Sequence, residues 1–293
     1  MSKLIDELAK RLKVLDKPVV TAIDVYRAID ELHKIENRSG LYLRRDEPTV
    51  EDYSKYADQL SISVGMIRGA RKGTWRIISK PSLSPEEMIC LSDPYSHVAY
   101  LSAMRVWQLT NRIPDKIIFS RIHSSLVKQK MLEEFPSSWP QPILPITNRN
   151  IGRFRDVDYT PLISISETKA PSTSTDLGGS YTRVTTQAST FVDMLTKPVL
   201  CGGMGHVLEI FDSLYKSRGQ KLHEEVVAII DEEAVSPIVK VRGGYVLSER
   251  LGLKHPVIES WTKFAARGGS RKLDPERSYL PTFSEKWMIS INA

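Results

Sequence analysis

Four basic residues lie within a stretch of nine: Arg68, Arg71, Lys72 and Arg76. Lysine and arginine side chains neutralise DNA phosphates, and each contact releases counterions, so binding through them weakens as salt rises. The stretch has two short apolar runs joined by a turn that glycines bound, a pattern that predicts a β-hairpin over 63–78 with a basic tip. We expect this tip to contact the phosphate backbone of DNA; the alternative is an ordinary solvated turn.

Further candidate DNA contacts precede the hairpin. Lys55 and Gln59 lie on the outward face of a predicted helix, and both residue types can donate to base edges in the major groove. Arg44 and Arg45, in the loop before that helix, are candidate phosphate contacts. The outward face of the helix also carries three carboxylates, which would repel phosphate: Glu51, Asp52 and Asp58.

Three predicted helices position these residues. Apolar residues at helical spacing indicate an amphipathic helix over 3–15, before Pro18. Thr21 is placed as the N-cap of a second helix, and Thr49 with Asp52 resembles a capping box that opens a third. Three helices followed by a basic hairpin within about 80 residues is the order of elements in a winged helix-turn-helix domain.

The remaining residues predict a second, larger domain. Two prolines in the run Lys80–Pro85 indicate a linker. Asp93-Pro94 is typical of a helix start, runs at 143–147 and 162–166 are strand-like, and amphipathic helices are predicted from 186 before a closing strand at 286–292. We therefore predict an α+β protein, with a winged helix-turn-helix at 1–80, a linker at 81–93 and a larger mixed α/β C-terminal domain at 94–293.

The charge distribution offers a second contact surface. The 293 residues carry a net charge of +6, and residues 1–80 hold 16 Lys/Arg against 12 Asp/Glu, whereas residues 250–293 hold 8 against 4. A basic surplus at both ends of the chain is compatible with two surfaces for an acidic partner or a nucleic acid. The candidate residues at the C-terminal end, which could also be merely solvated, are Arg267, Arg271, Lys272 and Arg277.

Composition excludes several classes of protein. No stretch approaches the roughly 20 apolar residues of a membrane-spanning helix, and the N-terminus is acidic where a signal peptide has its apolar core. We therefore expect a cytoplasmic protein with no membrane partner. Cys90 and Cys201 lie far apart with no companion at metal-ligand spacing, so neither a disulfide framework nor a structural zinc site is predicted, and no cofactor is expected.

Several patterns resemble fragments of catalytic sites. Asp158, Glu167 and Lys169 have the residue types of metal-dependent nucleases, in which carboxylates hold magnesium. Asp156 with Asp158, followed by Gly178-Gly179-Ser180, contains the parts of a nucleotidyltransferase site in reversed order. Such short patterns also arise by chance, and we expect no catalytic activity.

Two cysteine–histidine pairs could act as nucleophile and base: Cys201 with His206, and Cys90 with His97. Neither pair has a third group to orient the histidine, which makes this chemistry unfavoured. Gly202-Gly203-Met204-Gly205 lacks the strand that precedes a phosphate-binding loop, and close helix packing is the simpler interpretation.

The second half of the chain carries a series of motifs in a characteristic order. It runs from Ser189-Thr190-Phe191-Val192-Asp193-Met194-Leu195-Thr196-Lys197-Pro198 through Cys201-Gly202-Gly203 and Val207-Leu208-Glu209 to Gly244–Gly252, Leu273-Asp274-Pro275, Lys286-Trp287 and Asn292. Pro94–Ala103, ahead of Leu109-Thr110, precedes them. In this order, over roughly 65–293, the motifs resemble those of AbiEi-type antitoxins of type IV toxin–antitoxin systems, which act in abortive infection as phage defence.

The resemblance implies a fold and a function. In that family an N-terminal winged helix represses the operon as a transcriptional regulator, and the C-terminal domain counters a nucleotidyltransferase toxin. It implies that this chain is a non-catalytic antitoxin whose partners are operator DNA and a cognate toxin. Two alternatives stay open: a metal-dependent DNA nuclease that uses Asp158, Glu167 and Lys169, and a plain transcription regulator with a ligand-sensing C-terminal domain.

Overall fold

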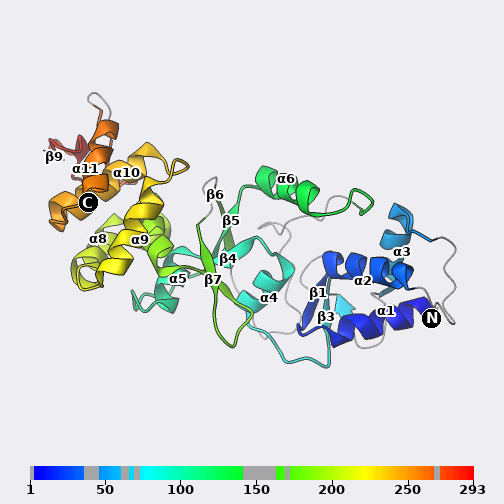
Figure 1. The fold of residues 1–293 in the computed structure, drawn as a ribbon. Coiled ribbons are helices and arrows are strands. Elements are labelled where there is room, and N and C mark those ends of the chain that lie inside the picture. Colours follow the sequence, from blue (N-terminus) through cyan, green and yellow to red (C-terminus); the bar gives the residue numbers. More distant parts are fainter. Residues whose placement is uncertain are drawn as a thin grey trace. The chain divides into compact units, whose positions relative to one another are not determined.

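The computed structural model describes residues 3–35, 46–60, 66–68 (backbone), 73–140, 163–168, 172–266 and 271–293. These residues form a mixed α and β structure with two compact units (Figure 1). The first unit comprises Met1–Ser96, Ile122–Glu167 and Gly178–Thr182, and the second comprises His97–Arg121, Thr168–Leu177 and Arg183–Ala293. Within the described ranges, no helix has both the length and the apolar character needed to cross a membrane.

The first unit begins with the predicted helices, which are α1 (Lys3–Val14), α2 (Ala22–Lys34) and α3 (Val50–Leu60). Thr21 caps α2, because the Asp24 carboxylate accepts from the Thr21 backbone N–H at 2.7 Å. Asp52 accepts from the Thr49 backbone N–H at 3.0 Å, and the Asp52 N–H donates back to the Thr49 hydroxyl. Both predicted helix starts are therefore confirmed.

A three-stranded antiparallel sheet joins these helices. Its strands, β1 (Val19–Thr21), β2 (Met66–Arg68) and β3 (Thr74–Ile77), lie in the order β1-β3-β2. Trp75 of β3 is paired with Val20 on one side and with Arg68 on the other. The predicted hairpin is thus confirmed as β2 and β3, although its tip at 69–72 lies outside the described residues. Strand β1 was not predicted, because three residues are too few for an alternating pattern.

Residues 122–140 complete the core of the first unit. Helix α6 (Ser124–Glu134) contributes Val127 and Met131 to the hydrophobic cluster that α1, α2 and β3 form, and Trp139 belongs to the same cluster. The Trp139 indole donates to Asp30 at 3.0 Å, and the Tyr53 hydroxyl donates to the same carboxylate. Asp30 of α2 therefore binds both α3 and a segment more than a hundred residues away.

The segment 81–93, predicted as a linker, contains helix α4 (Pro85–Ser92). Ser84 and Glu87 form a capping box at its start, and the Glu87 carboxylate also accepts from the Ser180 hydroxyl at 3.0 Å. The prediction that a helix begins at Asp93-Pro94 is wrong. The Asp93 carboxylate instead accepts from the Tyr95 N–H at 3.0 Å in a turn, and the next helix begins at Tyr100.

The second unit contains a sheet. Its strands run in the order β5-β4-β8-β7, with bounds β4 (Ser96–Val98), β5 (Ile117–Ile122), β7 (Ser174–Asp176) and β8 (Arg183–Thr185). β4 and β8 are parallel, and β7 and β8 are antiparallel. The strand predicted at 162–166 is present as β6 (Ile163–Thr168), whereas the run at 143–147 lies outside the described residues.

Helices contribute most of the residues of the hydrophobic core of the second unit, and Figure 1 shows them packed beside one another. They are α5 (Tyr100–Val106), α7 (Gln187–Thr196), α8 (Met204–Ile210), α9 (Gln220–Asp231), α10 (Pro237–Gly244) and α11 (Pro256–Ser260). π-Helical turns at Phe211–Tyr215 and Tyr245–Arg250 extend α8 and α10. The helices predicted after residue 186 are confirmed, and the closing strand is β10 (Ile289–Ser290), paired with β9 (Phe283–Ser284).

Several residues of the quoted motifs meet inside this core. Gly244 lies against Trp287, and a Cβ at Gly244 would come within 2.2 Å of the indole ring. Asn292 binds the 274–278 segment, because its amide oxygen accepts from the Asp274 N–H and its NH₂ group donates to the Asp274 carbonyl, both at 2.9 Å. The motifs therefore include contacts that hold the C-terminal strand on the helices.

Candidate functional site

Helix α3 has one buried face and one outward face. Tyr53, Ala57 and Leu60 are buried, whereas Lys55 is exposed and Gln59 is half-buried. Because residues four apart lie on the same side of a helix, Lys55 and Gln59 lie one turn from each other on the outward side. The structure therefore places both predicted base-reading residues where a ligand outside the unit could reach them.

The carboxylates of α3 are not equivalent. Asp52 accepts hydrogen bonds from both the N–H and the hydroxyl of Thr49, so it acts as part of the cap at the N-terminus. A negative charge is favourable there because of the helix dipole. Glu51 and Asp58 are exposed on the same helix, where their negative charges would repel a DNA phosphate. The acids that lie outside the cap on the outward side of α3 are therefore Glu51 and Asp58.

From Trp75 to Ile77, the side chains of strand β3 alternate between a buried and a more exposed face. Trp75 and Ile77 of β3 are buried in the core, and Arg76 between them is half-buried. This alternation directs Arg76 to the opposite face of the sheet from Trp75. The backbone of Arg68 is paired with Trp75 in β2. The side chain of Arg68 and four other predicted contacts lie outside the described residues: Arg44, Arg45, Arg71 and Lys72.

The basic residues near the C-terminus take part in the fold. Arg271 donates to the Phe264 carbonyl, and the Lys272 ammonium donates to the Arg277 carbonyl at 2.8 Å. The Arg277 side chain, which is 64% exposed, has its Nε 3.5 Å from Asp274 Oδ2. Arg267 lies outside the described residues. These contacts give Arg271 and Lys272 a structural role, and the second basic surface stays a prediction.

Of the three residues of the predicted nuclease site, Glu167 is the one that lies within the described residues. Glu167 accepts from the Ser124 hydroxyl and lies 3.8 Å from His123 Nε2, at the start of α6. Asp158, Lys169 and Asp156 lie outside the described residues, and Ser180 donates to Glu87. Among the residues that the structure describes, no three His, Cys, Asp or Glu side chains are grouped as a metal site requires.

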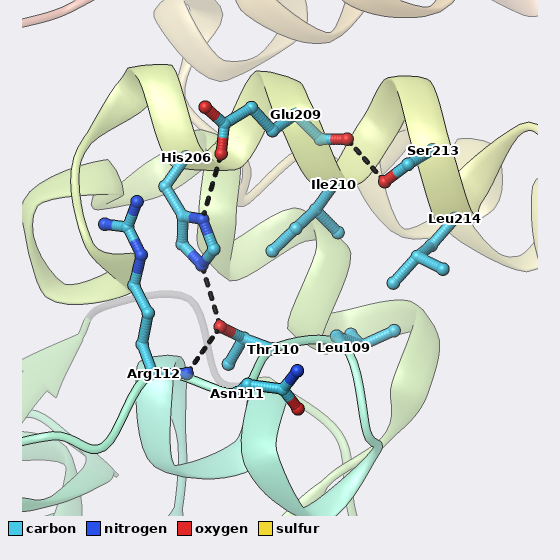
Figure 2. Close-up of a pocket in the computed structure, with 9 residues that line it drawn as sticks. All are labelled: Leu109, Thr110, Asn111, Arg112, His206, Glu209, Ile210, Ser213 and Leu214. Carbon is cyan, nitrogen blue, oxygen red and sulfur yellow. Dashed lines mark hydrogen bonds and ion pairs between the residues drawn. The ribbon is translucent and has the colours of Figure 1, made fainter.

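His206 contacts a threonine and a glutamate (Figure 2). Its Nε2 is 3.0 Å from Thr110 Oγ1, and its Nδ1 is 3.5 Å from Glu209 Oε2. Burial and the nearby Arg112 lower the pKa of His206. Cys201 is fully buried in the core, and burial raises the pKa of its thiol well above the usual range. A thiol that stays protonated is a poor nucleophile, so the Cys201–His206 pairing is not supported.

The Thr110–His206–Glu209 series lines an open pocket of about 490 Å³ (Figure 2). A hydroxyl, an imidazole and a carboxylate in this order have the residue types of a nucleophile triad. However, the Thr110 hydroxyl also accepts the Arg112 N–H at 3.1 Å, and the N–H groups of Gly202 and Gly203 both donate to the Pro198 carbonyl. These two glycines therefore offer no N–H to a developing oxyanion. The series instead joins the 109–112 loop to α8.

Sequence reasoning missed the roles of Thr110 and Arg112 in this pocket. Arg112 donates through Nη1 to the Gly202 carbonyl at 3.1 Å, across 90 positions of the chain. Neither residue belongs to a local pattern that would predict such a partner. A contact of this kind becomes visible when the fold is known.

No protein-family profile matches the sequence, and no significantly similar curated protein was found. Among solved structures, the chain is similar to the crystal structure of the RV2827C protein from Mycobacterium tuberculosis, with a TM-score of 0.46 and 14% identity. The alignment covers 97% of this chain and 89% of that chain. A likeness of this size carries no conclusion about function.

Proposed function

We propose that this chain is a DNA-binding repressor whose N-terminal elements form a winged helix-turn-helix. The observation that carries the proposal is the element order α1-β1-α2-α3-β2-β3, together with the antiparallel sheet order β1-β3-β2. In a helix-turn-helix domain the recognition helix enters the major groove. Helix α3 and the β2–β3 hairpin are the corresponding elements here.

The charges of α3 and the hairpin suggest which of them contacts phosphates and which contacts base edges. Helix α3 offers Lys55 and Gln59 to base edges but also exposes Glu51 and Asp58, so its net contribution to phosphate binding is small. The hairpin sequence carries four basic residues, Arg68, Arg71, Lys72 and Arg76. We therefore assign affinity mainly to the hairpin and base selection mainly to α3.

The second unit is proposed to serve as the antitoxin. Support comes from the resemblance of its motifs to those of AbiEi-type antitoxins, and several of these motif residues lie in contact within one core, as Gly244 does with Trp287. The proposed partner is a nucleotidyltransferase-like toxin encoded beside this chain, whose operon the first unit would repress. Repression and antitoxicity should then depend on different parts of the molecule.

The double substitution Arg71→Ala and Lys72→Ala tests this division. Removing two phosphate contacts should weaken binding to the DNA upstream of the chain's own reading frame and reduce the log–log salt slope by about 1 to 2. The same variant should lose repression of a promoter reporter while it still protects cells that express the adjacent toxin gene. Gel shifts over a salt series and a growth assay measure the two activities.

A matched control removes two exposed lysines from the second unit, with Lys216→Ala and Lys221→Ala. This variant has the same net charge as the first, so a general electrostatic effect would weaken DNA binding equally in both. Wild-type affinity and slope in the hairpin variant would reject the assignment of the hairpin. Lost protection in a hairpin variant that remains folded would reject the division between the units.

A further inference from the structure

The second unit contains a partly enclosed cavity of about 260 Å³. Helix α7 and Tyr100 form one part of its lining, and the end of α9 and the start of α10 form another. Its size suits a small molecule rather than a cofactor or a peptide. The cavity shares no lining residue with the pocket around His206.

Asp193 of α7 lines this cavity and is 7% exposed. The backbone N–H of Tyr100 donates to its carboxyl group. The second oxygen, Oδ2, has no hydrogen-bond partner among the residues that the structure describes. A buried acceptor without a partner costs free energy, and native proteins keep few of them. Among the described residues no donor binds this second oxygen, so the carboxyl group can accept a hydrogen bond from a ligand.

Tyr100 adds a second unusual feature at the same place. Its φ of +53° lies in the left-handed region, which is uncommon for a residue with a bulky side chain. Strained backbone of this kind persists where surrounding structure enforces it, and it is frequent in ligand sites. Here the strained residue supplies both the N–H that holds Asp193 and part of the cavity lining.

The rest of the lining combines hydroxyl groups with an aliphatic wall. Ser172 is held by His97, whose Nε2 lies 2.9 Å from the serine hydroxyl, and Ser189 Oγ is 2.7 Å from Thr173 Oγ1. Val192 and Val239 contribute aliphatic surface. Among the described lining residues none is lysine, arginine or histidine, and the carboxylates of Asp193 and Glu232 give the cavity an acidic character. An anionic ligand is therefore disfavoured.

We propose that this cavity binds a small organic cation, an amine with a short aliphatic chain. The ammonium group donates to the Asp193 carboxylate and to the hydroxyls beside it, and the carbon chain lies against the valine side chains. The acceptor without a partner, the acidic lining and the aliphatic wall each match one part of such a ligand. The site would add a ligand response to the second unit, beyond the proposed repressor and antitoxin activities.

Isothermal titration calorimetry of cadaverine with the full-length protein, in the absence of DNA, tests the proposal. Glutarate, which has a carbon chain of the same length but two carboxylates, is the control. We expect one cadaverine site per chain, no glutarate binding, and an affinity at least about tenfold lower in Asp193→Asn, as loss of a charge-assisted hydrogen bond predicts. Glu232→Gln, which removes an exposed charge at the cavity, should change the affinity much less.

The pH dependence gives a second readout. Burial raises the pKa of Asp193 to about 7, and the positive charge of Lys197 opposes this rise. Asp193 interacts electrostatically with the Lys197 ammonium and with the Cys201 thiol, which stays protonated. Glu232 lies on the α9 side of the cavity. Since a bound cation favours the carboxylate, cadaverine affinity should rise between about pH 6 and 8 in the wild type and not in Asp193→Asn.

The variants also report on folding. Folding raises the pKa of Asp193 from 3.8 to about 7. The free energy of unfolding therefore falls as the pH rises from about 4 to about 7, because the buried carboxyl group then has to ionise. Asp193→Asn should therefore be folded and more stable than the wild type at pH 8, with an advantage that shrinks toward pH 4.

A further variant fills the cavity without changing the carboxyl group. Ala234→Phe, at an exposed lining position, should block cadaverine binding while leaving Asp193 intact.

Equal cadaverine binding in the wild type and in folded Asp193→Asn, or no binding to the wild type in the millimolar range, would overturn the proposal. Binding of glutarate at the same site would overturn it as well. Because the assay contains no DNA and no toxin, none of these three outcomes bears on the proposed repressor function.

Discussion

Close packing against Trp287 explains why position 244 is a glycine. Its backbone lies against the indole of Trp287, which is fully buried, and an added Cβ would lie 2.2 Å from the ring. The ring belongs to the core and has no space into which it can withdraw. A side chain at this position must therefore separate α10 from the C-terminal segment.

Gly244→Ala should lower the free energy of unfolding by about 2 to 3 kcal/mol, as overpacking of a core does. Urea unfolding of the variant and the wild type measures the difference. Gly205→Ala is the matched control, because nothing lies within 4 Å of a Cβ at that helical position. That change should be neutral or stabilising by up to about 1 kcal/mol. Equal effects of the two substitutions would contradict the packing argument.

Local residue roles could be predicted from the sequence, and distant ones could not. The Thr49–Asp52 cap joins two residues three positions apart, so the sequence alone indicated it. Asp193 was recognised as part of a motif, but its partner Tyr100 is 93 positions away. No periodicity encodes such a pair, so the acidic cavity became visible with the fold.

The segment that contains α6 and Trp139 packs into the core of the first unit. Trp139 lies edge-on to Tyr26, with ring centroids 5.6 Å apart, and donates to Asp30. Burial and the Asp30 carboxylate raise the pKa of the Tyr53 hydroxyl, which shares this acceptor. Helix α3 is therefore held in place partly by residues that are distant in the sequence.

Trp139→Ala should cost about 3 to 5 kcal/mol, the usual effect of removing a buried aromatic ring. Hydrogen exchange in α2 and α3 should accelerate, whereas exchange in α7 to α10 should keep its wild-type rate. Leu132→Ala, which removes a side chain that is 58% exposed on α6, should change neither region. Unchanged exchange in α2 and α3 would show that Trp139 does not stabilise the first unit.

Amphipathic helices were the most predictable elements, because many residues contribute to each pattern. Short elements were not, as the missed β1 shows. The error at Asp93 has a chemical cause: an aspartate before a proline can cap a helix or close a turn, and both patterns use the same side-chain acceptor. The Tyr95 N–H takes that acceptor, and residues 96–98 form a strand instead.

The two compact units of the molecule are not two consecutive stretches of sequence. The first unit adds 122–167 and 178–182 to the N-terminal residues, although the sequence suggested a boundary near residue 80. A linker rich in proline and serine is a local signal, whereas the contacts of Val127 and Trp139 with the N-terminal helices are not. Each unit has its own hydrophobic core, as domains that could fold alone do.

In the proposed function, DNA lies against α3 and the β2–β3 hairpin. Hydrogen exchange of the full-length protein, with and without a duplex taken from upstream of its reading frame, tests this placement. We expect DNA to slow exchange in peptides covering Val50–Leu60 and Met66–Ile77, and this slowing should become smaller as salt is added. Slower exchange confined to the second unit, or none in either peptide at saturating DNA, would contradict it.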